Sequence, residues 1–221
     1  MKQTRQISDS VRLGLLLAIS GGFMDAYSYL FRGKVFANAQ TGNLLLLGLN
    51  IFEGHWDACI KYLVPIVCFM IGVFLATCIR RSFQSYKKFH WRQFTILIEA
   101  IVLFSVAFLP QSMNLLVNSL ISLSCGIQIE SFKKIHGLGA STTMCVGNLR
   151  SATSLLSDYI YTKDKEDLKK GLLYLLIIFF FVMGAVLGNV FIQSMGQYSI
   201  LICSLLLLVA FLSMFYHPES Y

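Results

Sequence analysis

The sequence predicts an all-α polytopic membrane protein, and three observations lead to that fold class. Of the 221 residues, 56% are hydrophobic and only 13% are charged, whereas a soluble domain carries about 25% charged residues. The apolar residues occur in long blocks, and a helix needs about 20 of them to cross a bilayer. The basic residues, which give a net charge of +7, form short clusters between these blocks, as charges beside membrane spans do. The lipid bilayer is therefore the expected partner, and nucleic acid is not.

Six stretches approach the length of a membrane span, and two others are too polar to be assigned in the same way. The six expected spans are residues 13–31, 61–80, 93–110, 113–132, 171–192 and 198–216. The weaker stretch 35–52 opens with the polar run "NAQTGN", and the weaker stretch 139–161 contains "STT", "GN" and an arginine. Because proline is scarce and no low-complexity linker occurs, we expect a single transmembrane domain over residues 1–221.

The distribution of basic residues predicts whether the weak stretches cross the membrane. Lys and Arg accumulate on the cytoplasmic side, and both the N-terminal segment and the cluster "RRSFQSYKKFHWR" at 80–92 are basic. Placing both inside requires an even number of crossings between them, which holds if 35–52 enters the membrane and returns. We therefore expect six spanning helices plus two re-entrant or half-helix segments, with both termini cytoplasmic. Eight spans with parallel repeats remain the alternative.

The two weak stretches belong to an internal repeat. The segment "SGGFMDAYSYL…QTGNLLLLG" matches "SCGIQIESFKK…CVGNLRSAT". Gly22 aligns with Gly126, and the G-N-L run that follows begins 20 residues later in the first copy and 21 residues later in the second. The chain therefore divides into repeat 1 (residues 1–110) and repeat 2 (residues 111–221). With six spans the copies enter from opposite sides, which makes them inverted repeats, an arrangement common in transporters.

The repeat explains why polar residues interrupt the stretch 35–52. Non-helical backbone at membrane depth is tolerated only where protein or a water-filled cavity surrounds it. We interpret residues 41–43 (Thr-Gly-Asn) as the tip of a re-entrant hairpin and residues 44–52 as its half-helix. Free N–H groups at such a helix start form a positive dipole end, which suits an anion or a carbonyl oxygen.

The same residues carry a resemblance to a known family. The segments "GGFMDAYSYLFRGKVFANAQTGN" and "GIQ…TTMCVGNL" resemble the YoaK-type family of bacterial integral membrane proteins, formerly a domain of unknown function. The resemblance covers nearly the whole chain and implies a multi-pass protein of the bacterial plasma (inner) membrane, without a substrate or reaction. In the second half, Ile129 and Val146 depart from the family pattern, which commonly has Asn and Thr at these positions.

Four charged residues lie within apolar stretches: Asp25, Glu99, Glu130 and Arg150. A charge at bilayer depth costs at least about 2.5–3.5 kcal/mol on insertion scales, so each requires a partner, a proton or water. We expect Asp25 to face the first hairpin and Glu130 to pair with a lysine near the cytoplasmic end. For Arg150 the sequence leaves open a structural pair with a carboxylate and a contact with a ligand.

We therefore expect a secondary transporter or channel for a small polar or anionic solute, with its site between the two half-helix tips. Asp25 and Glu99 are the candidates for proton or ion coupling. The alternative function is a non-transporting membrane scaffold or accessory subunit. The candidate substrate-binding residues are Asp25, Gln40, Thr41, Gly42, Asn43, Gln128, Gly147, Asn148 and Arg150.

Other classes of site have less support in the sequence. The four histidines are scattered, the six cysteines form no C-x-x-C pair, and no nucleophile–base pair stands out. We therefore expect neither an enzyme nor a metal or cofactor. Gly184 and Gly188 form a G-x-x-x-G pattern that favours close helix contact, either within the bundle or in a homo-oligomer.

Overall fold

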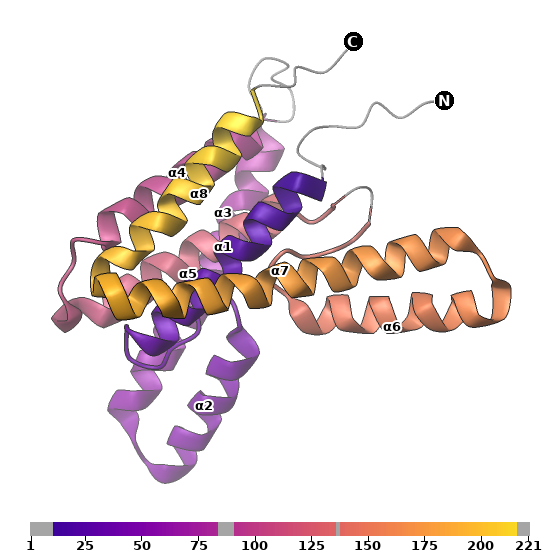
Figure 1. Ribbon diagram of the computed structural model, residues 1–221. Helices are drawn as coiled ribbons and strands as arrows, with labels where there is room; N and C mark the ends of the chain where they lie inside the picture. The colour runs from indigo at the N-terminus through magenta and orange to yellow at the C-terminus, as the bar shows by residue number, and fades with distance from the viewer. Residues whose placement is uncertain (1–10, 84–90, 136–137, 216–221) are drawn as a thin grey trace.

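The computed structural model describes residues 11–83, 91–135 and 138–215, and most of these residues are helical (Figure 1). Short 3-10 turns, η2 (Gln111–Met113) and η3 (Gly196–Ser199), precede the fifth and eighth helices. The eight α-helices are α1 (Val11–Leu30), α2 (Gln40–Glu53), α3 (Trp56–Phe83), α4 (Trp91–Val106), α5 (Asn114–Ser131), α6 (Cys145–Thr162), α7 (Lys165–Met195) and α8 (Ile200–Ser213).

Each of the six expected spans overlaps one helix, and each of the two weak stretches overlaps a separate helix, α2 of 14 residues or α6 of 18 residues. Within the described residues, four helical stretches are long and apolar enough to cross a membrane. They are Val11–Leu30, Trp56–Ser82, Gln111–Ser131 and Lys165–Ser213, the last of which includes both α7 and α8. The predicted all-helical membrane fold is therefore confirmed at this level.

Local chemistry sets several helix ends. The side chain of Asp164 accepts a hydrogen bond of 2.9 Å from the Glu166 N–H and so caps the start of α7, where the N–H groups lack partners within the helix. Helix α2 stops at Gly54 with φ +74°, and α7 stops at Gly196 with φ +55°. Both glycines adopt backbone angles that other residues rarely reach.

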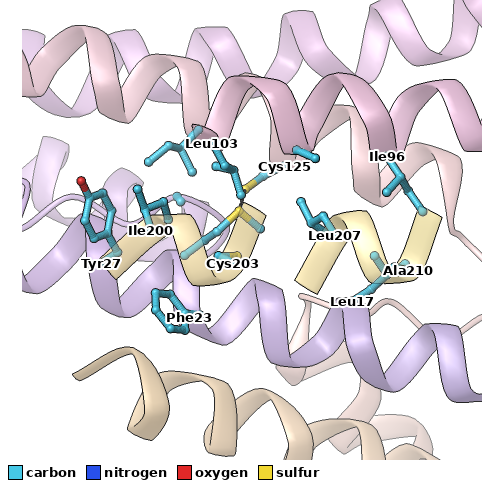
Figure 2. Packing of buried hydrophobic residues seen from close by; sticks show 14 of the residues in the cluster. Leu17, Phe23, Tyr27, Ile96, Leu103, Cys125, Ile200, Cys203, Leu207 and Ala210 are labelled. Atoms are coloured by element: carbon cyan, nitrogen blue, oxygen red, sulfur yellow. Dashed lines mark hydrogen bonds between the residues drawn. The ribbon is translucent and has the colours of Figure 1, made fainter. Parts of the chain in front are cut away.

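The core lies between α1, α4, α5 and α8 (Figure 2). Side chains such as Leu17 of α1, Leu103 of α4 and Leu207 of α8 meet there and are almost completely buried. By contrast, α3 and α7 present large apolar side chains outward, including Phe74 and Phe179. Such outward apolar faces suit a chain whose surroundings are lipid rather than water.

Helix α1 crosses α7 at very short range through glycines. A Cβ atom on Gly22 would overlap the carbonyl oxygen of Phe181, and one on Gly184 would overlap the carbonyl oxygen of Ile19. Gly188 faces α1 as well, against Phe23. The G-x-x-x-G pattern of α7 therefore serves packing inside the molecule, which is one of the two roles expected from the sequence.

The crossing of α3 with α5 repeats this arrangement. A Cβ atom on Gly126 would overlap the carbonyl oxygen of Phe69, and one on Gly72 would overlap that of Leu123. In both crossings each carbonyl belongs to the residue three positions before the glycine on its own helix. Gly126, the residue that the sequence aligns with Gly22, thus has the equivalent contact.

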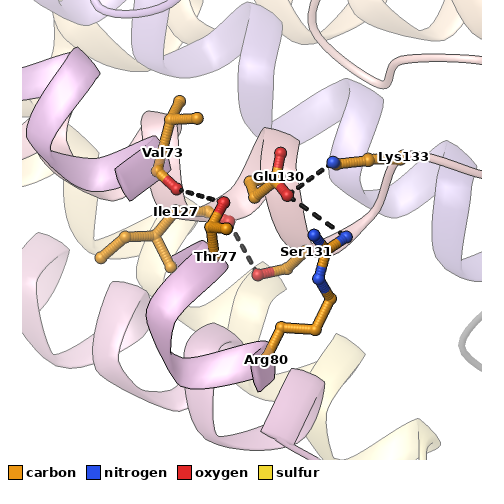
Figure 3. A network of polar contacts seen from close by, with 7 residues as sticks. All are labelled: Val73, Thr77, Arg80, Ile127, Glu130, Ser131 and Lys133. Atoms are coloured by element: carbon orange, nitrogen blue, oxygen red, sulfur yellow. Dashed lines mark hydrogen bonds and ion pairs between the residues drawn. The ribbon is translucent and has the colours of Figure 1, made fainter. Parts of the chain in front are cut away.

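A polar network joins α3 and α5 at one end of this crossing (Figure 3). The Glu130 carboxylate lies 2.5 Å from the Lys133 ammonium and 3.4 Å from the Arg80 guanidinium. The ion pair between Glu130 and a nearby lysine was expected from the sequence and is present. Arg80 adds a contact between the two helices.

Arg32, which the sequence analysis did not single out, is completely buried just after α1. Its guanidinium donates to the Tyr27 hydroxyl at 2.9 Å, the Val106 carbonyl at 3.2 Å and the Asn114 side chain at 3.4 Å. Val106 ends α4, where the helix dipole is negative and attracts a cation. Arg32 therefore connects the end of α1 to the end of α4 and the start of α5.

We expect Gly22→Ala and Gly126→Ala each to lower the free energy of unfolding by about 1–3 kcal/mol, because overpacking against backbone cannot be relieved by a side-chain movement. Denaturant or thermal unfolding of the purified protein in detergent would measure the loss. Gly48→Ala is the matched control, since nothing lies within 4 Å of a Cβ at Gly48. Unchanged stability in both crossing variants would contradict this packing.

Candidate functional site

The loop between α1 and α2 folds back beside the middle of α1. The Asn38 N–H donates to the Asp25 carboxylate at 2.7 Å, and the Asn38 side chain donates to the Gly21 carbonyl at 3.1 Å. Asp25 thus faces the first hairpin, as the sequence predicted. The predicted boundary of that hairpin was wrong, because α2 already begins at Gln40. Residues 41–43 therefore form the first turn of the helix, and residues 36–39 form the tip.

Asn43 holds this tip by a pair of hydrogen bonds to one residue. Its Oδ1 accepts from the Phe36 N–H at 2.9 Å, and its Nδ2 donates to the Phe36 carbonyl at 2.7 Å. The same Nδ2 also donates to Gln40 Oε1 at 2.9 Å. Asn43 is fully buried, so its amide replaces the hydrogen bonds that Phe36 would otherwise make in a helix or to water.

Side chains also satisfy the other polar backbone groups of the tip. The Ala37 N–H donates to the Ser28 hydroxyl at 3.1 Å, and the Gln40 side chain donates to the Ala37 carbonyl at 2.8 Å. With the bond from Asn38 to Asp25, every backbone N–H from residue 36 to residue 38 has a side-chain acceptor. Asp25 therefore lies beside the start of α2, where the sequence analysis expected a ligand.

The second half of the chain contains an equivalent loop between α5 and α6. Asn148 Oδ1 accepts from the Ser141 N–H at 3.2 Å, and its Nδ2 donates to the Ser141 carbonyl at 2.5 Å. In both halves the asparagine binds the residue seven positions earlier in the chain. The second loop has no counterpart of Asp25, since Ile129 is the aligned residue.

A cavity of about 690 Å³ lies between the two helix starts. Asp25, Gln40 and Thr41 line it from the first half of the chain, and Gly147 lines it from the start of α6. The structure therefore brings four of the predicted site residues, from both repeats, to one cavity. Gly147 leaves open space there, because a Cβ at this position would meet no atom of the described residues within 4 Å.

Five other predicted residues do not line the cavity. Gly42 packs against the ring of Phe36, and Asn43 and Asn148 are buried and bonded to their loops. Gln128 is buried in α5, and neither polar atom of its side-chain amide has a hydrogen-bond partner among the described residues. Arg150 lies exposed on α6.

The coupling candidate Glu99 also lies away from the cavity. It is buried in α4, near the thiols of Cys125 and Cys203. Its Oε1 has no hydrogen-bond partner in the described part of the chain.

The sequence analysis missed most of the cavity lining, which is apolar and aromatic. Tyr29, Phe36, Phe69 and Phe181 contribute rings, and Asn189 of α7 adds a polar group. No signal in the sequence distinguishes these aromatic residues from those that face lipid, because both kinds lie in uniformly apolar helices.

Comparisons with known proteins place the chain in a family. Residues 13–213 match the family described as "Protein of unknown function (DUF1275)". The chain belongs to this family. It is 29% identical over 181 residues to the UPF0700 transmembrane protein YoaK of Bacillus subtilis (strain 168), a match that covers 78% of this chain and 79% of the relative. No solved structure matches the chain.

The family resemblance seen in the sequence is thereby confirmed. The transmembrane relative and the long apolar helices identify the chain as an integral membrane protein with several membrane-spanning helices.

We expect Asn43→Leu and Asn148→Leu each to lower the free energy of unfolding by about 2 kcal/mol or more, because each leaves a backbone N–H and carbonyl without a partner. Denaturant unfolding in detergent would measure this. Asn50→Leu is the control, since among the described residues the Asn50 side chain donates to the Leu46 carbonyl within its own helix. Equal effects at Asn43 and Asn50 would contradict the proposed role of the loop bonds.

Proposed function

We propose that the protein is a secondary transporter or channel for a small solute, with its binding site in the cavity between the starts of α2 and α6. The observation that carries the proposal is that both halves of the chain interrupt a helix and contribute the interrupted end to one cavity. Transporters commonly bind their substrates between broken helices from two inverted repeats.

The contacts of the two halves support inverted repeats. The pair α1–α7 and the pair α3–α5 cross through the same glycine arrangement, and both loops are held by an asparagine at the same spacing. In Figure 1, α2 runs beside the first half of α3, and α6 runs beside the first half of α7, with the two hairpins projecting in different directions. We therefore propose repeats over residues 1–110 and 111–221.

The charges of the connecting segments support six spans with two re-entrant segments. Arg80 and Arg81 lie in the last turn of α3, Lys163 lies between α6 and α7, and Lys165 begins α7. Placing these groups in the cytoplasm of a bacterial cell satisfies the positive-inside rule and leaves both termini cytoplasmic. The α2–α3 connection, which contains the acidic Glu53, then faces outward across the inner membrane.

The same cavity supports transport over the scaffold alternative. A scaffold needs polar groups only to satisfy the backbone, and it could fill the space between the two helix starts with leucine. Here the space is open, and Asp25 and Thr41 reach it. Asp25 is therefore our first candidate for coupling to a proton or ion, and Glu99 is the second. We propose no catalytic reaction for this site.

The proposed topology predicts the accessibility of cysteines introduced at three exposed positions. His55→Cys and Ser112→Cys should react with a membrane-impermeant maleimide added to intact spheroplasts, whereas Lys165→Cys should react only after permeabilisation. Background labelling of the native cysteines would be subtracted. Protection of positions 55 and 112 in intact spheroplasts would contradict six spans and favour eight spans with parallel repeats.

Filling the cavity should stop transport without unfolding the protein. We expect Gly147→Trp to reduce uptake to that of empty vesicles, because the new side chain has room only in the cavity. The assay is uptake of a panel of radiolabelled small amines, alcohols and carboxylic acids by proteoliposomes. Gly48→Trp is the control, since it is equally open but lies outside the cavity. Uptake by wild type no faster than by empty vesicles, or unchanged uptake by Gly147→Trp, would contradict the proposal.

A further inference from the structure

Two buried polar groups beside the cavity lack hydrogen-bond partners among the described residues. Asn38 is only 6% exposed and lines the cavity, and its Oδ1, which can only accept, has no donor in the described part of the chain. Thr143, 5% exposed, lines it too, and its hydroxyl, which can accept or donate, has no described partner. A buried polar group without a partner is costly. A ligand that brings N–H or O–H groups would satisfy them.

The charge of the cavity also favours a ligand with a cationic hydrogen-bond donor. Asp25 is the one charged side chain among the described residues that line it. Arg150, a cationic residue that the sequence predicted at the site, is exposed on α6 and does not line the cavity. The Lys34 ammonium lies over the Tyr29 ring, 4.8 Å from its centroid, and Lys34 does not line the cavity either. In the cavity, an anionic solute would therefore meet the Asp25 carboxylate and no cationic side chain among the described lining residues.

The other lining residues indicate the chemistry of the rest of the ligand. Rings of Phe36, Phe69 and Phe181 and aliphatic side chains such as Val182 surround the space. Its volume of about 690 Å³ falls in the range of small-molecule sites, about 300–1,000 Å³. Apolar walls with a few polar groups bind ligands that are themselves apolar except at one end. Aromatic faces also attract cations.

From these observations we infer that the cavity binds a small apolar amine in its protonated form. The ammonium group would lie toward Asp25 and Asn38 Oδ1, and the hydrocarbon or aromatic body would lie against the phenylalanine rings. This inference rests on the proposed transport site and narrows its solute from the wider class of small polar or anionic compounds.

The test compares three probes of one shape in nanodiscs of phosphatidylcholine at pH 7, by isothermal titration calorimetry. Phenethylamine carries a cationic donor, 2-phenylethanol a neutral hydroxyl and phenylacetate an anion. We expect phenethylamine to bind at least about tenfold more tightly than phenylacetate, because a charge-assisted hydrogen bond is stronger than a neutral one and like charges repel. Equal or tighter binding of phenylacetate would overturn the inference.

Single-residue variants test whether Asp25 causes the preference for phenethylamine. Asp25→Asn keeps the acceptor for the Asn38 N–H but removes the charge, so phenethylamine should bind no better than 2-phenylethanol, whose affinity should stay unchanged. Asp57→Asn, an exposed carboxylate outside the cavity, is the control. Thr143→Val, which removes a hydroxyl that can accept from either ligand without removing charge, should weaken the binding of phenethylamine and 2-phenylethanol. Melting temperatures would show that each variant is folded. An undiminished preference for the amine in Asp25→Asn would overturn the inference.

Two further experiments, with the Gly147→Trp variant and with a second lipid, distinguish failure of the inferred solute class from failure of the proposed transport site. If Gly147→Trp abolishes binding of all three probes but the amine is not preferred, the cavity is the site and only the inferred solute class fails. If Gly147→Trp leaves all binding unchanged, the proposed transport site itself fails. Replacing part of the phosphatidylcholine by phosphatidylethanolamine should not weaken phenethylamine binding. Competition would identify the amine headgroup of a lipid as the occupant and would overturn the inference of a free solute.

Discussion

A peptide group inside the hydrocarbon of a membrane must find its hydrogen-bond partner within the protein, and this constraint governs the two interrupted helices. At each interruption a buried asparagine, Asn43 or Asn148, supplies both an acceptor and a donor to one loop residue. A side-chain amide has the same two groups as a peptide and can pair with it completely. The loops can therefore lie inside the protein without unpaired groups at these residues.

The placement of the loops depends on how closely the long helices approach one another. Glycines let the backbones of α1 and α7 touch, and glycines do the same for α3 and α5. Each loop then leads into the next helix, α2 or α6, beside the first of these crossings, and the cavity lies between the two helix starts. Its polar lining includes Asp25, which binds the first loop, and the loop residues Asn38 and Thr143. The affinity that we infer for an amine thus follows from the same constraint that shapes the backbone.

The sequence predicts the helices well because apolar length is a direct physical requirement of a membrane span. It also identifies the matched G-N-L runs, since their spacing is visible without a structure. It could not assign the Asn43 side chain, because an asparagine that binds a ligand and one that binds backbone look alike in sequence. For the same reason it placed the hairpin tip about four residues too late. Arg32 was missed because its partners, Val106 and Asn114, are distant in the chain, and the aromatic lining because it lies in uniformly apolar segments.

Backbone hydrogen exchange at the two loop residues held by asparagine tests the central claim most directly. In uniformly labelled protein in nanodiscs, the amide protons of Phe36 and Ser141 should exchange slowly although both residues lie outside helices, because each N–H is bonded to a buried side chain. The amide of Lys165, at the exposed start of α7, should exchange rapidly under the same conditions. Exchange of Phe36 and Ser141 as fast as that of Lys165 would show that the loops are not held in this way, and would contradict the account.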